Sequence, residues 1–503
     1  MMSTSAGGCN KPAFGSALRP GLSSGIIAGK TVSTWAFGDT PSAGGLHVSA
    51  GDMLEATFVN KLPSHNTVHW HGLALRNDMD GVHDLTMGSV EAGGQFTYRF
   101  TVPDPGTYWF HPHMGLELDR GLYAPLIVED PHEPLAYDLD VTLMLDDWLD
   151  GFGRTPEEVL AEMKKTGGHA HNMGNMAGMG DMSGMSGMGN MGSTDTTAMA
   201  GMSGMDPYAG DVVYPHHLIN GRAANDRQTI EAKPGQKVRI RIINAASDTA
   251  YRFGIAGHQL TVTHADGFPV EHVTVDHLMI GMGERYDVLV TAGDGAFPII
   301  AAPEGKADPY AEAVLRTNTD ASPAAGSWPA ELDGKGLSYS MLRTTQPLAA
   351  RQPDRSETIM LTVGSHYVHG INGASFPNST PVVVHQGERL RLVVMNHTMM
   401  FHPIHLHGHT FQLASGGAVF DAITVYPKVG YRILDWLEGH ELAEGVGGGV
   451  TATRTFGAPS ASPSTATSAR MIRGDSRHSC AAGCSSPMTP ATPSPTMRAE
   501  RPG

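Results

Sequence analysis

The side chains in this sequence that are best suited to chemistry are histidines, grouped in the motifs "VHWHG", "FHPHMG" and "FHPIHLHGHTF". Each motif contains a His-x-His step. In a β-strand, residues two apart lie on the same face, so both imidazoles of a step would point at one site or at adjacent metal ions. The candidate ligands are His69, His71, His111, His113, His402, His405 and His407.

The composition of these clusters favours copper. Imidazoles without carboxylates suit copper or zinc better than calcium or magnesium. A zinc hydrolase would also need a general base beside its ligands, and no HExxH motif occurs. The chain contains 28 methionines, and their soft thioethers suit Cu(I). We therefore predict a copper site.

Ten of the methionines fall in a low-complexity segment, mostly three apart among Gly, Ser, Ala, Asn and Asp. This composition offers too little branched apolar surface to offset chain entropy, so residues 168–205 are predicted to form a flexible insertion. The segment is either a linker or a site for Cu(I), and we favour the second because a linker has no need of methionine. The accessory ligands would be Met173, Met176, Met179, Met182, Met185, Met188, Met191, Met199, Met202 and Met205.

Three copies of one pattern predict the fold. Residues 51–60 ("GDMLEATFVN"), 235–244 ("GQKVRIRIIN") and 387–396 ("GERLRLVVMN") each place a glycine before an alternating apolar strand, and an asparagine nine positions after that glycine. Alternation with period two marks half-buried strands. Closely spaced turn residues point to antiparallel sandwiches. We predict an all-β fold with three sandwich domains, and further strands in "QFTYRFTV" and "YDVLVTA".

Charge, hydropathy and cysteine content exclude several classes of protein. The formal net charge is −16 without a polybasic stripe, which argues against a nucleic-acid partner. No apolar run approaches the roughly 20 residues that span a bilayer, so no transmembrane segment is predicted. Cys9, Cys480 and Cys484 form no CxxC pair, and no disulfide framework emerges.

At these motifs the chain resembles the multicopper oxidases, which are laccase-like enzymes of three cupredoxin domains. The segments that carry the resemblance are "TVHWHGLALRNDMDG", "PDPGTYWFHPH", "GERYDVLV" and "HPIHLHGHTFQ", in the family's order, and it runs from about residue 25 to about residue 430. It is closest to the bacterial, actinobacterial type. The resemblance implies cupredoxin-like Greek-key sandwiches and four copper ions in a complete member.

The resemblance also implies a role for each matching residue. His69 and His405 would bind the type 2 copper, and His402 would bind the type 1 copper that collects electrons from substrate. The type 3 copper pair would be bound by His71, His111, His113 and His407.

Two further residues beside the motifs have alternative interpretations. Asp80 matches an acidic residue that relays protons to reduced oxygen, although an aspartate before Gly81 fits a turn equally well. His409 is interpreted as a supporting residue rather than a ligand. The resemblance implies one-electron oxidation of cuprous ion, phenols or ferrous iron, coupled to reduction of dioxygen to water, in copper tolerance. It also implies a place outside the cytoplasm (periplasm, cell envelope or secreted), although no complete signal peptide is visible.

One motif of the family is missing from this chain. In the family, a His-Cys-His sequence followed by another His and a Met supplies the type 1 cysteine. After His409 only His440 and His478 remain, and neither adjoins a cysteine. Two explanations compete: a shift of the reading frame near residues 415–445, or a true loss of the type 1 site. The unpatterned tail favours the frameshift. A two-domain copper nitrite reductase fits three repeats poorly.

The missing motif affects both the predicted domains and the predicted activity. As written, the chain is expected to bind copper partially without oxidase turnover, and the alternative function is a copper-sequestering protein. The predicted segments are a disordered N-terminal segment (1–24), domain 1 (25–135), domain 2 with its insertion (136–350), a partial domain 3 (351–440) and an unpatterned tail, disordered or out of frame (441–503).

Overall fold

The structure is a computed structural model of the 503-residue chain. It describes residues 14–38, 45–166, 209–318, 323, 326–347, 351–376, 378–385, 387–398, 400–413, 417–425, 442–446 and 468–469. The predictions for the ten accessory methionines and the three cysteines lie outside the described residues. Among the residues described, no helix is long and apolar enough to cross a membrane.

The first sandwich packs two sheets around buried aromatic side chains. One sheet has the strand order β1-β5-β7 and the other β4-β9-β8-β6. Phe58, Trp70 and Tyr98 are fully buried in this core, where the Trp70 and Tyr98 rings meet edge to face. The strands are β1 (Phe14–Leu18), the hairpin β2 (Gly21–Ile27) and β3 (Lys30–Ala36), β4 (Leu46–Ser49), β5 (Met53–Val59), β6 (His69–His71), β7 (Gln95–Thr101), β8 (Gly106–His111) and β9 (Ala124–Glu129).

The second sandwich is the larger. Its sheets have the strand orders β11-β10-β13-β18-β15-β16 and β12-β20-β19-β14-β17. The strands are β10 (Leu139–Trp148), β11 (His216–Ile219), β12 (Thr229–Glu231), β13 (Lys237–Asn244), β14 (Tyr251–Ile255), β15 (Leu260–Ala265), β16 (Phe268–Val275), β17 (His277–Ile280), β18 (Arg285–Thr291), β19 (Ala296–Pro303) and β20 (Ala311–Arg316). In the part of the chain that the structure describes, the helices are α1 (Pro156–Thr166) and the short 3-10 helices η1 (Asn77–Met79), η2 (Leu118–Arg120), η3 (Ala224–Asp226), η4 (Ala330–Asp333), η5 (Tyr339–Met341) and η6 (Ser365–Tyr367).

The third sandwich is less regular. It consists of the sheet β22-β21-β24-β29 and the two-stranded pairs β23-β30, β25-β28 and β26-β27. The strands are β21 (Arg355–Gly364), β22 (Val368–Ile371), β23 (Val382–Val383), β24 (Arg389–Asn396), β25 (His402–His405), β26 (Phe411–Gln412), β27 (Val419–Phe420), β28 (Ala422–Val425), β29 (Leu442–Val446) and β30 (Ser468–Ala469).

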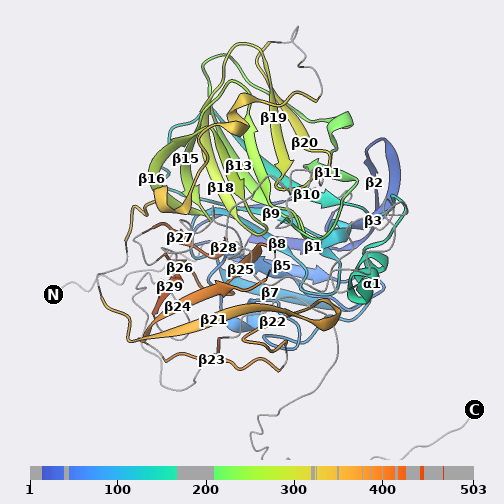
Figure 1. The fold of residues 1–503 in the computed structure, drawn as a ribbon, viewed down its shortest axis with the longest axis vertical. Helices are drawn as coiled ribbons and strands as arrows, with labels where there is room; N and C mark the ends of the chain where they lie inside the picture. Colours follow the sequence, from blue (N-terminus) through green and yellow to red (C-terminus); the bar gives the residue numbers. More distant parts are fainter. Residues whose placement is uncertain are drawn as a thin grey trace, which may run out of the picture.

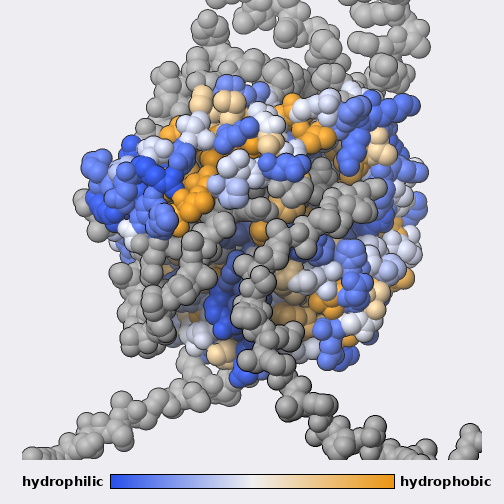
Figure 2. Space-filling model, turned by 90° about the horizontal axis from the view of Figure 1, so that it is seen from below, coloured by the Kyte–Doolittle hydropathy of each residue, from blue (hydrophilic) through white to orange (hydrophobic). Residues whose placement is uncertain are grey.

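Two short strands lie within residues 441–503, the segment predicted to be an unpatterned tail. Strand β29 pairs antiparallel with β24, and β30 pairs with β23. The physical reason is that an open sheet edge presents backbone N–H and C=O groups, which pair with an extended segment whatever its sequence. Apolar side chains are nevertheless exposed on this sandwich: Val363, Val368, Phe376 and Val383 are at least 36% exposed. Figure 2, viewed from below, shows apolar patches (orange) on this face of the molecule.

The predicted repeat is confirmed, and the structure explains its asparagine. The three copies form β5, β13 and β24, and each ends beside a buried asparagine: Asn60, Asn244 and Asn396. In every copy the side-chain oxygen accepts the N–H two residues later. The amide nitrogen donates to one carbonyl four or five residues later and to a second carbonyl farther along the chain. The asparagine therefore closes the loop that leads into the next strand.

The three sandwiches meet near the centre of the molecule. In Figure 1 the second sandwich (green to yellow) lies above the first (blue) and the third (orange). Strand β8 of the first sandwich lies next to β13 and β18 of the second. The pair β25-β28 of the third sandwich also lies near the centre of Figure 1. The strands that carry the histidine motifs converge, since the rings of His71 and His405 stack against each other.

Candidate metal centre

Six of the seven predicted ligands lie in one cluster between the first and third sandwiches. Strand β6 pairs with β8, which places His69 directly opposite His111. Strand β25 pairs with β28 and ends at His405. The rings of His71 and His405 stack with their centroids 3.8 Å apart, so the two sandwiches touch here. The cluster consists of His69, His71, His111, His113, His405 and His407.

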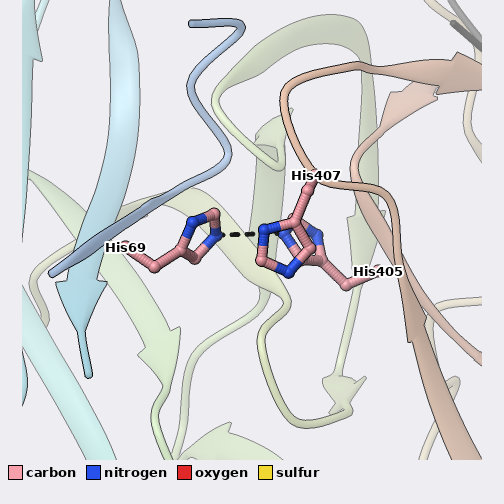
Figure 3. A group of neighbouring side chains, drawn as sticks. All are labelled: His69, His405 and His407. Atoms are coloured by element: carbon pink, nitrogen blue, oxygen red, sulfur yellow. Dashed lines mark hydrogen bonds between the residues drawn. The ribbon is translucent and has the colours of Figure 1, made fainter. Parts of the chain in front are cut away.

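The ring nitrogens of these histidines approach one another in three pairs. Figure 3 shows His69 facing His405 and His407 from the opposite side of the site. Two of the pairs join the first sandwich to the third, and one lies within the first. The pairs are His69 Nε2 with His405 Nε2 (3.3 Å), His113 Nε2 with His407 Nε2 (3.2 Å) and His71 Nδ1 with His111 Nε2 (3.3 Å).

For most of these rings, the second nitrogen faces an oxygen that can only accept a hydrogen bond. A backbone carbonyl lies 2.8 Å from Nδ1 of three rings, and a carboxylate oxygen lies beside the second nitrogen of two more. The carbonyl contacts are His69 with Asp80, His111 with Pro112 and His405 with Asp421. The carboxylate contacts are His407 Nδ1 with Asp80 Oδ2 (3.1 Å) and His71 Nε2 with Asp421 Oδ1 (3.3 Å).

These contacts determine which nitrogen has a free lone pair. A neutral imidazole carries one N–H, and the oxygen acceptors draw it to the outer nitrogen of the five rings that have such a contact. In the pair of His69 and His405, two lone pairs therefore face each other at 3.3 Å. Two metal–nitrogen bonds of about 2.0–2.1 Å at a tetrahedral angle would separate the nitrogens by about 3.3–3.4 Å. The spacing and the tautomers both fit a metal cation between the rings.

Burial favours the neutral, metal-binding form of these rings. Desolvation lowers the pKa of His69, His71, His111, His113 and His407 below the ordinary histidine value. At neutral pH these rings therefore present lone pairs rather than positive charges, as metal binding requires.

Asp80 is both a turn residue and a contact of the cluster. It follows η1 and precedes Gly81, which has a φ of +82°. A Cβ atom at Gly81 would lie 1.8 Å from the carbonyl oxygen of Val68, so this position requires glycine. The Asp80 carboxylate lies 3.3 Å from His69 Nδ1 and 3.1 Å from His407 Nδ1. Its proposed role in proton transfer stays a prediction.

Sequence reasoning missed Asp421, which lies between the two histidine-bearing sandwiches. Its Oδ1 atom is 3.3 Å from His71 Nε2 and 3.4 Å from His405 Nδ1. Although burial raises it, the neighbouring Arg285 guanidinium holds the pKa of Asp421 well below the usual range. The only signal in the sequence was a charged residue inside the apolar stretch "AVFDAITV".

His402 and His409 lie outside the three nitrogen pairs. His402 is buried on β25, with its Nε2 atom 2.7 Å from Thr398 Oγ1. An open pocket lies beside it, lined by Leu361, Thr362, His369, Phe376, His402 and Ile404 among others. His409 Nδ1 lies 3.0 Å from the carbonyl oxygen of His407. This contact supports the backbone that carries a predicted ligand.

Family models of multicopper oxidases match three consecutive parts of the chain: residues 24–133, 140–320 and 347–428. Multicopper oxidase MmcO of Mycobacterium tuberculosis is 42% identical over 417 residues, covering 80% of this chain and 77% of that protein. A copper resistance protein A homolog of Pseudomonas syringae pv. tomato is 28% identical, covering 71% and 76%.

Solved structures share the fold. The crystal structure of Fet3p, described as a multicopper oxidase that functions in iron import, has a TM-score of 0.67 at 18% identity and covers 83% of this chain and 84% of that chain. The laccase from Botrytis aclada has a TM-score of 0.64 at 22% identity, covering 86% and 82%. Together with the 42% identical relative and the three matching family models, these findings show that the chain belongs to the multicopper oxidase family, laccase-like oxidoreductases whose cofactor is copper.

Proposed function

We propose that the six-histidine cluster binds three copper ions, one at each nitrogen pair. His69 and His405 would hold the type 2 copper. The type 3 pair would be held by His71 with His111 and by His113 with His407. The observation that carries this proposal is the set of three nitrogen pairs, each 3.2–3.3 Å apart.

The residues around the cluster would orient the ligands and handle protons. Bound copper would supply the redox chemistry by which electrons from a substrate reduce dioxygen to water. Asp80 accepts the N–H of His407 at Oδ2 and that of His69 at its carbonyl oxygen, which exposes Nε2 of both rings. The carbonyl oxygen of Asp421 faces Nδ1 of His405, which leaves Nε2 of that ring exposed. The Oδ1 atom of Asp421 lies beside Nε2 of His71, which leaves Nδ1 of that ring exposed. The Asp80 carboxylate, which contacts two of these rings, would be the group that relays a proton beside the cluster.

We propose cuprous ion as the substrate, with phenols and ferrous iron as the other candidates. Two observations support this choice: the methionine-rich insertion, and relatives named as copper resistance proteins. Copper tolerance outside the cytoplasm would be the corresponding role. Deleting residues 173–205 should reduce cuprous oxidation much more than phenol oxidation by an oxidase-competent form of the protein. Equal losses for both substrates would rule out a substrate role for the insertion.

The chain as written is proposed to lack oxidase turnover. A type 1 site needs a cysteine thiolate, and no His-Cys-His motif follows the part of the chain that matches the family models, which ends at residue 428. The copper-loaded chain should therefore show no blue thiolate-to-copper absorption. The missing cysteine also favours the second candidate function, copper sequestration without turnover. A blue preparation that consumes oxygen would overturn both statements.

A copper titration tests the proposed ligands. The full chain, purified free of metal, would be titrated with Cu(II) without reductant, because thioethers prefer Cu(I). Bound copper would be counted by mass spectrometry after desalting. We expect three tightly bound ions per chain, and two after His111→Ala.

A control variant separates loss of a ligand from general damage. His258→Ala removes a histidine of the second sandwich whose ring contacts the Ala256 carbonyl and the Gly293 N–H. This variant should still bind three ions. Retention of three ions by His111→Ala, or fewer than three by the unaltered chain, would contradict the proposed ligand set.

A further inference from the structure

The side chain of Arg285, in the second sandwich, contacts both the first and the third. It is fully buried, at the start of β18 in the second sandwich. An arginine side chain has five N–H donors in a rigid planar fork, and here all five have an acceptor. The acceptors are the carbonyl oxygens of Thr107 (3.1 Å), Asp266 (3.1 Å) and Gly283 (3.0 Å), and the two carboxylate oxygens of Asp421 (2.7 and 2.5 Å).

Two of these acceptor residues, Thr107 and Asp421, belong to the first and third sandwiches, whose strands carry the proposed copper ligands. Thr107 lies on β8, the strand that ends at His111 in the first sandwich. Asp421 immediately precedes β28, whose first residue pairs with His405 in the third sandwich. The Asp421 carboxylate also lies 3.3 Å from His71 Nε2. One buried guanidinium therefore connects the backbone of the first sandwich to a side chain that contacts histidines of the first and the third.

The local sequence leaves space for this arrangement. Gly72 follows His71, and a Cβ atom at this glycine would lie 2.4 Å from Arg285 Nη2 and 2.7 Å from Asp421 Oδ2. The arginine also lies over the ring of Tyr108, 5.7 Å from its centroid. A side chain at position 72 would thus displace the bidentate contact between Arg285 and Asp421.

We propose that Arg285 is a positioning residue, which sets the third sandwich against the first at the separation that the copper ions require, without touching a ligand itself. The inference rests on the proposed function of the six-histidine cluster. Two nitrogen pairs, His69 with His405 and His113 with His407, span the two sandwiches. The pair of His71 and His111 lies within the first sandwich. Loss of the Arg285 contacts should therefore affect the two copper positions that span the sandwiches more than the third, whose ligands both lie in the first sandwich.

Arg285→Lys is the variant that tests this role. Lysine keeps the positive charge but has no planar fork, so it cannot make the bidentate contact to Asp421 together with the contact to Thr107. The third sandwich keeps another attachment, since the Glu284 carboxylate accepts the Thr424 N–H at 2.8 Å. The variant should therefore lose the orientation of the third sandwich rather than its fold.

The control is another buried arginine of the second sandwich. Arg241 makes a bidentate contact to Asp140, with both distances 2.8 Å, and also donates to Thr107 Oγ1. Its partners among the described residues lie in the first and second sandwiches. Arg241→Lys thus also replaces a buried guanidinium by an ammonium group of the same charge, but it should leave the third sandwich in place.

The measurement is the number of Cu(II) ions bound per chain, together with electron paramagnetic resonance to count uncoupled copper. We expect three ions for the unaltered chain and for Arg241→Lys, and one ion, uncoupled, for Arg285→Lys. Circular dichroism would verify that each variant is folded. If Arg285→Lys does not fold, Asp266→Asn takes its place. One oxygen of the Asp266 carboxylate accepts the backbone N–H groups of Asp421 and Ala422, and the other accepts the backbone N–H of Arg285. An amide has only one oxygen, so it cannot accept on both sides.

The outcomes separate this inference from the proposed function. If the unaltered chain binds three ions and folded Arg285→Lys also binds three, the positioning role is refuted while the ligand set stands. If Arg285→Lys and Arg241→Lys lose copper equally, the effect is general destabilisation and the inference is wrong. If the unaltered chain itself binds fewer than three ions, the proposed function fails first.

Discussion

Replacement of Glu117 by glutamine should stabilise the protein at neutral pH. Glu117 is buried, with its Oε1 atom 3.0 Å from Ser64 Oγ and its Oε2 atom accepting from Asn66 Nδ2. Through these contacts it connects the segment after His113 to the segment before β6. Burial raises its pKa to about 8, from an ordinary value of 4.5. The folded chain therefore retains a proton that the unfolded chain loses.

The magnitude follows from the difference in proton binding. Between pH 4.5 and pH 8 the folded state binds more protons than the unfolded state, so stability falls as pH rises. At pH 7 ionisation of the unfolded chain opposes folding by about 3 kcal/mol, at 1.36 kcal/mol for each pKa unit. Glutamine stays neutral and can still donate to Ser64 and accept from Asn66. Glu117→Gln should therefore raise the free energy of unfolding by up to about 3 kcal/mol at pH 7, and by less than about 1 kcal/mol at pH 5.

Urea unfolding of the metal-free chain, followed by circular dichroism at pH 5 and pH 7, measures this difference. Glu91→Gln, at an exposed position, is the matched control and should change stability little at either pH. The reasoning is refuted if Glu117→Gln is no more stable than the unaltered chain at pH 7. It is equally refuted if any gain is the same at both pH values.

Two further variants test the turns that support the cluster. Gly81→Ala should lower the thermal unfolding temperature and the number of bound copper ions, because its methyl group would overlap the Val68 carbonyl oxygen and displace Asp80; a variant with unchanged copper content would contradict the role of this turn. Asn244→Ala should destabilise the second sandwich by about 2–4 kcal/mol in urea unfolding, because it leaves buried backbone groups without partners. A loss below about 0.5 kcal/mol would show that water or a shifted loop replaces these bonds.

Much of the fold could be read from local sequence. The strands at residues 51–60, 235–244 and 387–396 were recognisable because alternation with period two is a local property, and each copy carries its own loop-closing asparagine. The strands β7 and β18 were predicted for the same reason. Strand β29 was missed, because backbone pairing at an open edge does not depend on the side chains that an alternation pattern records.

The sequence by itself determined the residue types of the metal centre. His-x-His steps on strands place two imidazoles on one face. The absence of carboxylates from the motifs favoured copper or zinc, and the methionines favoured copper of the two. The tertiary structure decided which imidazoles meet across the sandwiches, since His69 and His405 are 336 positions apart in the chain and 3.3 Å apart in space.

Only the tertiary structure also decided which ring nitrogens of the cluster are left free of an oxygen acceptor. That choice depends on oxygen acceptors, such as those of Asp80 and Asp421, that reach the outer nitrogens from other segments. Arg285 belongs to the same category, because nothing in "GERYDVLV" indicates that its guanidinium would bond to three sandwiches at once. Ligand identity is a local property of the chain, whereas ligand geometry is a property of long-range packing, and a copper site requires both.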